Sequence, residues 1–147
     1  MADLRSLAES IGLENVRTYI QSGNLLFESE KAEEMLTREL ENSIRDYLGK
    51  DILVVIRTDK KLRSLVEDNP FPHSNPSYVG VMLFAKPVED SFLEGVSTLG
   101  DEEMVIGKRE VYINYPDGMG RSKLKLPKEE KLGTTRNINT LTKLLTL

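Results

Sequence analysis

The residues best suited to chemistry lie in a short loop of the C-terminal third, where two glycines precede an arginine, a serine and a lysine. Gly118 and Gly120 would let the backbone approach a ligand closely and turn its N–H groups toward an anion. Arg121 could hold a phosphate or carboxylate through two parallel hydrogen bonds. Ser122 would add a hydroxyl donor and Lys123 a point charge. The spacing is not that of a P-loop, so the pattern favours an anion site rather than nucleotide hydrolysis, and a plain turn that needs two glycines is the alternative.

A second polar segment, TTRNINT at residues 134–140, precedes an apolar stretch and is typical of a helix N-terminus. Threonine and asparagine oxygens can accept the N–H groups of a first helical turn, and a helix N-terminus attracts anions. Arg136 beside it would strengthen that attraction. We expect one anion pocket if Arg136 and Asn137 converge with Arg121 and Lys123, whereas capping alone would explain the threonines and asparagines without a ligand.

Composition excludes several kinds of catalysis. The chain has no cysteine, which rules out a disulfide, a thiolate metal site and a catalytic thiol. Its one histidine, His73, lies in a proline-rich loop, and no group of histidine and carboxylate residues has the spacing of metal ligands. The only compact set for an enzyme is Tyr115, Asp117, Arg121 and Lys123. Asp117 would act there as a base if its pKa were raised, but the catalytic residues stay unassigned and no metal or cofactor is expected.

Charge is unevenly distributed along the chain. The formal net charge is −4, yet residues 1–103 carry 11 Lys and Arg against 20 Asp and Glu, and residues 104–147 carry 9 against 4. The basic C-terminal third suggests an anionic partner, unless the two parts neutralise each other inside the fold. The net charge disfavours strong non-specific binding to nucleic acid. The sequence shows no membrane-spanning run and no signal peptide, so we expect a cytoplasmic protein without a membrane partner.

Hydrophobic periodicity predicts an α+β fold. In the first part of the chain it predicts helices at residues 1–11 and 31–48 and strands at 16–20, 25–27 and 52–56. The last of these strands is the apolar run ILVVI, which is typical of a strand buried on both faces.

The rest of the chain continues the alternation. The same periodicity predicts helices at residues 60–68 and 88–99 and a terminal helix that ends with residues 141–147. It predicts strands at 78–85, 103–106 and 110–115. The hairpins demand antiparallel pairing, so the helices should cover sheet faces. We place the boundary after residue 58, with a truncated ferredoxin-like subdomain at 1–58 and a second α+β subdomain at 59–147 that includes the basic segment.

Three segments together resemble one protein family. They are MADLRSLAESIGLENVRTYIQSGNLLFES at residues 1–29, YINYPDGMGRSKL at 112–124 and TTRNINTLTKLL at 134–145. In order and spacing they are similar to the mostly bacterial family called domain of unknown function 1697. The resemblance covers nearly the whole chain, and it implies an α+β fold with ferredoxin-like subdomains but no established activity.

The chain departs from that family's pattern in two places. Family members usually begin with a further strand and a Gly-containing loop, whereas residue 1 here already opens the first helix. In a ferredoxin-like sheet of spatial order 4-1-3-2 that strand is central, and unpaired buried backbone groups cost about 1–3 kcal/mol each. We therefore expect a gapped first sheet, direct pairing of 52–56 with 25–27, or rescue by another chain. The second departure is Ile138, where the family usually has tryptophan.

Three functions remain open. The leading hypothesis is a binding module for a phosphorylated small molecule or, less favoured, a nucleic-acid backbone. Its site would combine Gly118, Gly120, Arg121, Ser122, Lys123, Arg136 and Asn137. The second hypothesis is an assembly protein that forms a homo-oligomer through an exposed sheet edge. The third is an enzyme that uses Asp117 and Arg121.

Overall fold

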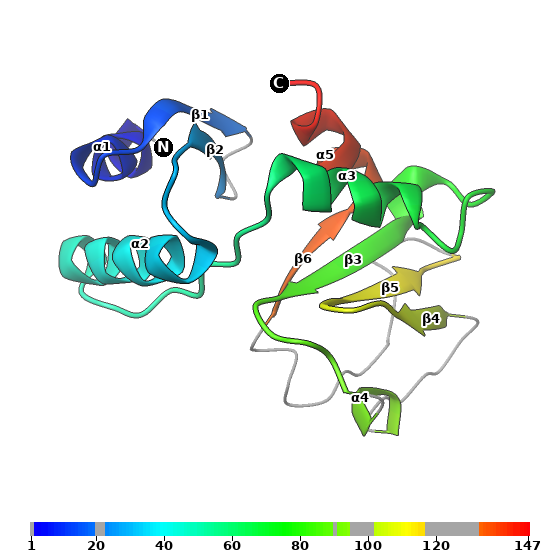
Figure 1. Ribbon diagram of the computed structural model, residues 1–147. Coiled ribbons are helices and arrows are strands. Elements are labelled where there is room, and N and C mark those ends of the chain that lie inside the picture. The colour runs from blue at the N-terminus through cyan, green and yellow to red at the C-terminus, as the bar shows by residue number, and fades with distance from the viewer. Residues whose placement is uncertain (1, 20–22, 90, 95–101, 117–132) are drawn as a thin grey trace. The chain divides into compact units, whose positions relative to one another are not determined.

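The computed structural model describes residues 2–19, 23–89, 91–94, 102–116 and 133–147 (Figure 1). The chain divides into two compact units, Met1–Ile56 and Arg57–Leu147, which we name unit 1 and unit 2. Both combine helices with antiparallel strands, so the predicted α+β fold class is confirmed. Within the described ranges, no helix has the length and apolar character needed to cross a membrane.

Unit 1 consists of helices and a β-hairpin. Its elements are α1 (Ala2–Ser10), β1 (Glu14–Tyr19), β2 (Asn24–Glu28) and α2 (Glu33–Leu48). Helix α2 repeats its apolar residues at helical spacing, and Leu36, Leu40 and Ile44 are therefore buried in one stripe. It ends at Gly49, which has a φ of 74° and so occupies the left-handed region that glycine tolerates.

One apolar cluster holds unit 1 together. Its buried members are Ala8, Leu13, Val16, Leu36 and Leu40. Partly buried residues that pack against them include Leu25 and Phe27 of β2 and, from the segment that follows α2, Val54 and Ile56. The hairpin and the segment 52–56 therefore rest on the same core.

Residues 52–56 correct the sequence-based expectation of a buried strand. No strand is assigned between residues 51 and 58, and the sheet of unit 1 contains only β1 and β2 in the part of the chain that the structure describes. Direct pairing of 52–56 with β2 is thus not observed, whereas the other two alternatives stay predictions. The physical reason is that apolar contacts can bury a segment, whereas a strand also needs a neighbour's N–H and C=O groups.

Unit 2 is built on a four-stranded antiparallel sheet. Its strands are β3 (Val79–Phe84), β4 (Glu103–Ile106), β5 (Glu110–Asn114) and β6 (Gly133–Asn137). Their spatial order is β4-β5-β3-β6. Numbered in chain order and read from β6, this is 4-1-3-2, the order of a ferredoxin-like sheet. The other elements of the unit are α3 (Asp59–Glu67), the 3₁₀ turn η1 (Pro76–Tyr78), α4 (Ser91–Glu94) and α5 (Ile138–Leu144).

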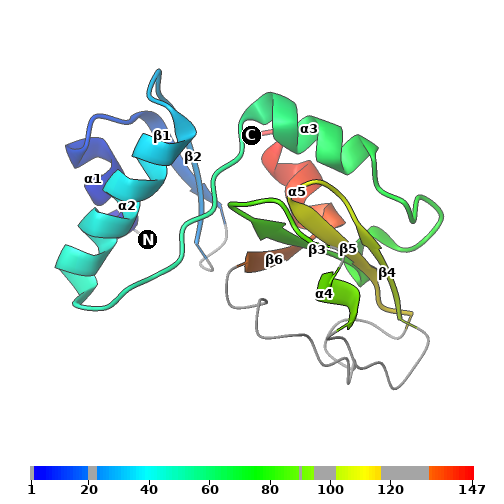
Figure 2. The same ribbon diagram turned by 60° about the horizontal axis from the view of Figure 1, so that its bottom comes forward.

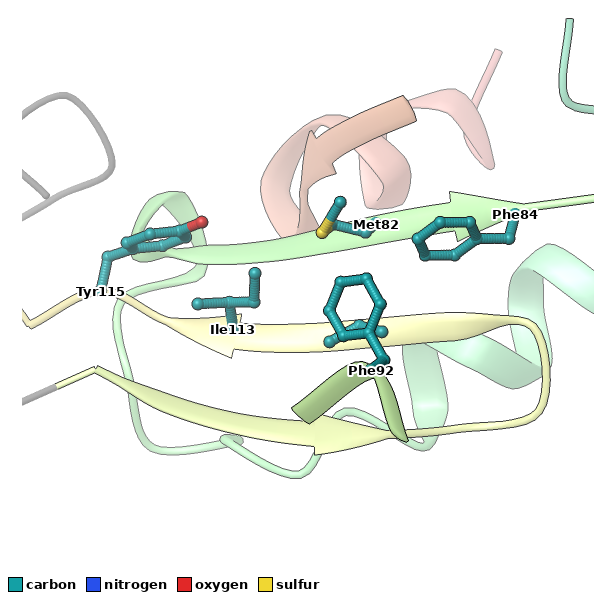
Figure 3. Packing of buried hydrophobic residues seen from close by; sticks show 6 residues of the cluster. Met82, Phe84, Phe92, Ile113 and Tyr115 are labelled. Carbon is teal, nitrogen blue, oxygen red and sulfur yellow. The ribbon is translucent and has the colours of Figure 1, made fainter. Parts of the chain in front are cut away.

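Different helices cover the two faces of this sheet. Helices α3 and α5 lie together over one face, and α4 lies on the other (Figures 1 and 2). On the α4 side, Met82 and Phe84 of β3 form a core with Phe92, Ile113 and Tyr115 (Figure 3). The rings of Phe84 and Phe92 meet edge to face, with centroids 5.8 Å apart and planes at 74°.

Two elements of unit 2 differ from the prediction. Strand β6 was not expected, because its polar sequence GTTRN reads as the approach to a helix, yet it pairs with β3 and α5 begins only at Ile138. The helix expected from Val88 begins at Ser91. The backbone N–H of Val88 instead donates to the carbonyl of Lys108 at 3.0 Å, which ties that residue to the β4–β5 connection.

The Arg57 side chain lies at one end of the β3–β5 ladder and binds backbone carbonyls there. It is only 6% exposed and lies 3.4 Å from the Glu110 carboxylate. Its Nη2 also donates to the carbonyl of Phe84 at 2.7 Å and to that of Arg109 at 3.0 Å. This buried cation is paired with a carboxylate and with two carbonyls, the condition under which a buried charge is tolerated.

Candidate functional site

Arg136 is the basic candidate residue that the structure places. Its strand, β6, pairs with β3 so that Arg136 stands opposite Val81, and Val81 stands opposite Tyr112 of β5. Directly opposed residues share one face of a sheet. The three side chains therefore form a row across the sheet, in which Val81 and Tyr112 are buried and Arg136 is half-buried.

The Arg136 guanidinium is held by its own strand. Its Nη1 donates to the hydroxyl of Thr134 at 2.9 Å and to the carbonyl of Thr135 at 2.8 Å. Burial removes water from the charged form and lowers the pKa of Arg136 below its ordinary value. An arginine nevertheless stays protonated at neutral pH, so β6 carries a positive charge with reduced hydration.

Asn137 has a structural role in this site. It is the N-cap of α5, and its Oδ1 accepts the N–H of Thr140 at 2.7 Å. Among the threonines and asparagines of residues 134–140 that could cap the helix, Asn137 is therefore the one used. Helix α5 has only seven residues, so we attribute no anion site to its N-terminus. The Oδ1 atom of Asn137 already accepts the Thr140 N–H as the helix cap.

The other residues of the predicted anion site lie outside the described residues. These are Gly118, Gly120, Arg121, Ser122 and Lys123, together with Asp117 of the enzyme hypothesis. Their convergence with Arg136 thus stays a prediction.

Two residues considered for catalysis can be placed. Tyr115 is 7% exposed and its ring belongs to the core of unit 2 (Figure 3). The other members of the compact catalytic set lie outside the described residues, so a role for Tyr115 among them stays a prediction. His73 is exposed in the loop between α3 and η1. No group of three or more histidine and carboxylate side chains suited to a metal ion occurs among the residues with assigned positions.

Tyr112 is a buried polar residue that sequence reasoning did not single out. Its hydroxyl donates to the carbonyl of Leu65 in α3 at 2.6 Å. Burial raises the pKa of Tyr112, and the nearby carboxylates of Glu110 and Asp68 raise it further. The hydroxyl is thus a neutral donor that fastens α3 to the sheet, and its partner lies 47 positions away in sequence, which no local pattern could reveal.

An open hollow of about 520 Å³ on unit 1 was also not anticipated. It is lined by Arg5, Glu9, Asn15, Val16, Arg17 and Glu28. Asn15 has a φ of 49°, and its Nδ2 donates to Glu28 Oε2 at 2.8 Å where the β1–β2 register shifts. Two arginines and two glutamates balance one another here, so the lining has no net preference for an anion or a cation.

Comparison with known proteins places the chain in a family. The family model described as "Protein of unknown function (DUF1697)" matches residues 1–112, about three quarters of the chain. The chain belongs to the DUF1697 family. The matched range ends at Tyr112, the first residue of the second resembling segment, so the rest of that segment and all of the third lie beyond it. No curated protein matches the chain in sequence.

Among solved structures, the DUF1697 chain is similar to a conserved bacterial protein from Streptococcus pneumoniae. The TM-score is 0.81 at 22% sequence identity, over 99% of this chain and 87% of that one. At that identity the likeness concerns the fold alone, and it agrees with the α+β architecture. The family's function is unknown, so function must be argued from this chain's own residues.

Proposed function

We propose that the chain is a binding module for a phosphate-bearing ligand, held by the basic segment 104–147. The observation that supports this best is the half-buried Arg136 on β6. A phosphate is the group shared by the two ligand types considered, a phosphorylated small molecule and a nucleic-acid backbone.

The physical argument starts from the hydration of Arg136. Burial penalises its charged form, as the lowered pKa shows, and an anion beside it would offset that penalty. Charge pairs also attract more strongly where the effective dielectric constant is low. The hydrogen bonds that Arg136 donates to Thr134 and Thr135 orient the guanidinium before a ligand arrives, so less rotational freedom is lost on binding.

The sequence supplies further positive charge to the same segment. Residues 104–147 have a net charge of +5, from 9 Lys and Arg against 4 Asp and Glu. Arg121 and Lys123 belong to this segment. A phosphate ligand is favoured over a neutral one because it would bring negative charge to this surplus.

The test is calorimetric titration of the full chain with inorganic pyrophosphate, a nucleoside triphosphate and a short single-stranded RNA, at low and moderate salt. We expect Arg136→Gln to weaken binding about 10- to 100-fold, the loss of a charge-assisted hydrogen bond worth about 1.5–3 kcal/mol. The matched control is Arg63→Gln, which removes the same charge from an exposed residue of α3 and should leave affinity within about twofold.

The two ligand types are separated by their salt dependence. A nucleic-acid backbone should bind with a steep loss of affinity as salt rises, whereas a single phosphorylated molecule should show a shallow one. Arg121→Ala tests separately whether the Gly-rich loop takes part. Equal affinities for the wild type and Arg136→Gln, or no heat with any of the three probes, would contradict the proposal.

Assembly through a sheet edge is a second candidate function. The observation that favours it is the segment 52–56 of unit 1, which is apolar and lies outside any sheet.

A further inference from the structure

Strand β4 lies at one edge of the unit 2 sheet, beside β5 (Figure 1). Its side chains alternate as those of a strand covered on one face do. Met104 and Ile106 are partly buried and pack against the core on the α4 side, whereas Glu103 and Val105 are exposed. The strand is therefore regular, and the directions of its backbone groups follow from its pairing with β5.

The ladder between β4 and β5 shows which backbone groups of β4 point outward. The N–H of Gly107 donates to the carbonyl of Glu110 at 2.8 Å, and the β4–β5 register continues from there without a shift. In an antiparallel pair, hydrogen-bonded and non-hydrogen-bonded positions alternate. Met104 and Ile106 therefore turn their N–H and C=O groups away from β5, and these groups have no partner among the described residues.

The opposite edge of the sheet, β6, is partly occupied by a charged side chain. The N–H of Phe84 donates toward β5, to the carbonyl of Arg109 at 2.9 Å, so Val81 and its partner Arg136 turn their backbone groups toward each other. Thr135 then turns outward, and its carbonyl accepts Arg136 Nη1 at 2.8 Å. Basic side chains and prolines are common protection for a sheet edge. Strand β4 contains neither, so it is the edge that is open to another strand.

We propose that the β4 edge pairs with the β4 edge of a second copy of the chain. In an antiparallel pair with a two-fold axis at Val105, Met104 of each copy faces Ile106 of the other. Each such pair exchanges both of its N–H and C=O groups, so four hydrogen bonds form from groups that point outward in the single chain. The two sheets become one continuous sheet, and an isologous contact of this kind is the usual way in which homodimers close.

The order of charges around β4 suits a second copy. Glu102 and Glu103 precede the apolar residues MVI, and Lys108 and Arg109 follow them. Antiparallel self-pairing places the acidic end of each strand beside the basic end of the other, and opposite charges on neighbouring strands stabilise a pair. At the axis the two Val105 side chains, each 41% exposed in the single chain, would cover each other.

Cysteine cross-linking tests the register directly, because the chain has no cysteine. In the proposed pair the two Val105 residues oppose each other as a non-hydrogen-bonded pair, with Cα atoms about 4.5 Å apart, a separation that a disulfide spans. We expect Val105→Cys to form a covalent dimer under mild oxidation. The matched control is Glu103→Cys, another exposed position on the same strand. Its two copies would lie four residues out of register, about 14 Å apart, so it should stay monomeric.

Analytical ultracentrifugation of the full chain provides the equilibrium test. We expect the mass to rise toward twice the monomer value as concentration goes from micromolar to millimolar. Val105→Lys should abolish that rise, because it opposes two like charges at the axis. Tyr78→Lys, at a residue 40% exposed, should preserve it. Thermal melts would show that both variants are folded.

Reversal of one charge tests the choice of a second copy as the partner. Lys108→Glu would place like charges beside each other on both sides of the axis, so we expect the dissociation constant of the dimer to rise about fivefold at low salt. The matched control is Lys143→Glu, the same reversal at an exposed residue of α5, which should leave the constant within about twofold.

Four results would overturn the proposal. One is a wild-type chain that stays monomeric at all concentrations, and another is a dimer that both Val105→Lys and Lys108→Glu leave unchanged. The third is cross-linking of Glu103→Cys as readily as Val105→Cys, which would show that the register is wrong. The fourth is a monomer whose Met104 and Ile106 amides become protected from hydrogen exchange when an unrelated extended peptide is added, since that would assign the edge to a different partner.

Discussion

The hydroxyl of Tyr112 is a single contact that fastens a helix to a sheet. Its bond of 2.6 Å to the Leu65 carbonyl joins β5 to α3. Tyr112→Phe removes the donor and leaves that carbonyl without its partner, so we expect a loss of about 1–3 kcal/mol in the free energy of unfolding. Urea unfolding measures it. Tyr78→Phe, at a residue 40% exposed, is the control and should change stability by less than about 0.5 kcal/mol.

The raised pKa of Tyr112 also predicts how stability depends on pH. In the unfolded chain the phenol titrates near the ordinary tyrosine pKa of about 10, whereas burial raises the pKa of Tyr112 in the folded chain and keeps it protonated. Above that pH the unfolded state binds fewer protons than the folded state, so stability falls as pH rises. Tyr112→Phe should reduce this slope above pH 10. A slope equal to that of the wild type would show that Tyr112 is not protected by the fold.

Among the elements, β6 depends on a glycine at its first residue. A Cβ at Gly133 would lie 2.7 Å from Cε1 and 2.9 Å from Cζ of the Phe84 ring, and that ring is held edge-on by Phe92. Gly133→Ala should therefore cost about 1–3 kcal/mol by overpacking. Gly107→Ala is the comparison, because a Cβ there would lie no nearer than 3.1 Å to its closest neighbour, the Glu110 carboxylate, which must give by only a few tenths of an ångström. Thermal unfolding that ranks the two variants alike would argue against a tight contact at β6.

The sequence predicted correctly those elements that depend only on residues close together along the chain. Helix α2 followed from its apolar stripe, and a cap by a threonine or asparagine of residues 134–140 followed from their place before an apolar run, although the sequence did not select Asn137 among them. The segment 52–56 and strand β6 show the limit of this reasoning, in opposite directions. ILVVI has strand composition but no ladder, whereas GTTRN has little strand composition but pairs with β3 along its length. Pairing is a long-range property, so propensity decided neither case.

The residues of the candidate site also differ in whether the local sequence could predict their surroundings. Arg136 could be selected from the sequence as a cation near a helix start, but its place in the sheet depends on pairing with β3, which lies far from it along the chain. The bond from Tyr112 to Leu65 was likewise beyond local reasoning. The Gly-rich loop contributes only sequence chemistry, because residues 117–132 are outside the described residues.

At the scale of the whole molecule, the two units differ in charge. Residues 1–56 have a net charge of −5, and residues 57–147, with 14 Lys and Arg against 13 Asp and Glu, have a net charge of +1. The surplus of +5 in residues 104–147 is therefore offset within unit 2 by residues 57–103. The proposed phosphate site near Arg136 belongs to unit 2, so a substitution in unit 1 such as Leu53→Lys should leave phosphate affinity intact.

The carboxylate of Glu41 limits how much bare backbone the apolar run ILVVI presents. By accepting the Val54 N–H, it gives that donor a partner within unit 1 and fastens the segment after α2 to the helix before it. Without this carboxylate, an apolar stretch of high strand propensity would offer a backbone donor to other molecules, which is a condition that favours aggregation. We expect thioflavin T fluorescence to rise on prolonged incubation of Glu41→Ala but not of Glu34→Ala, an exposed change on the same helix. If the two variants stay equally clear, the carboxylate does not limit aggregation, and the protection of this run must come from elsewhere in the chain.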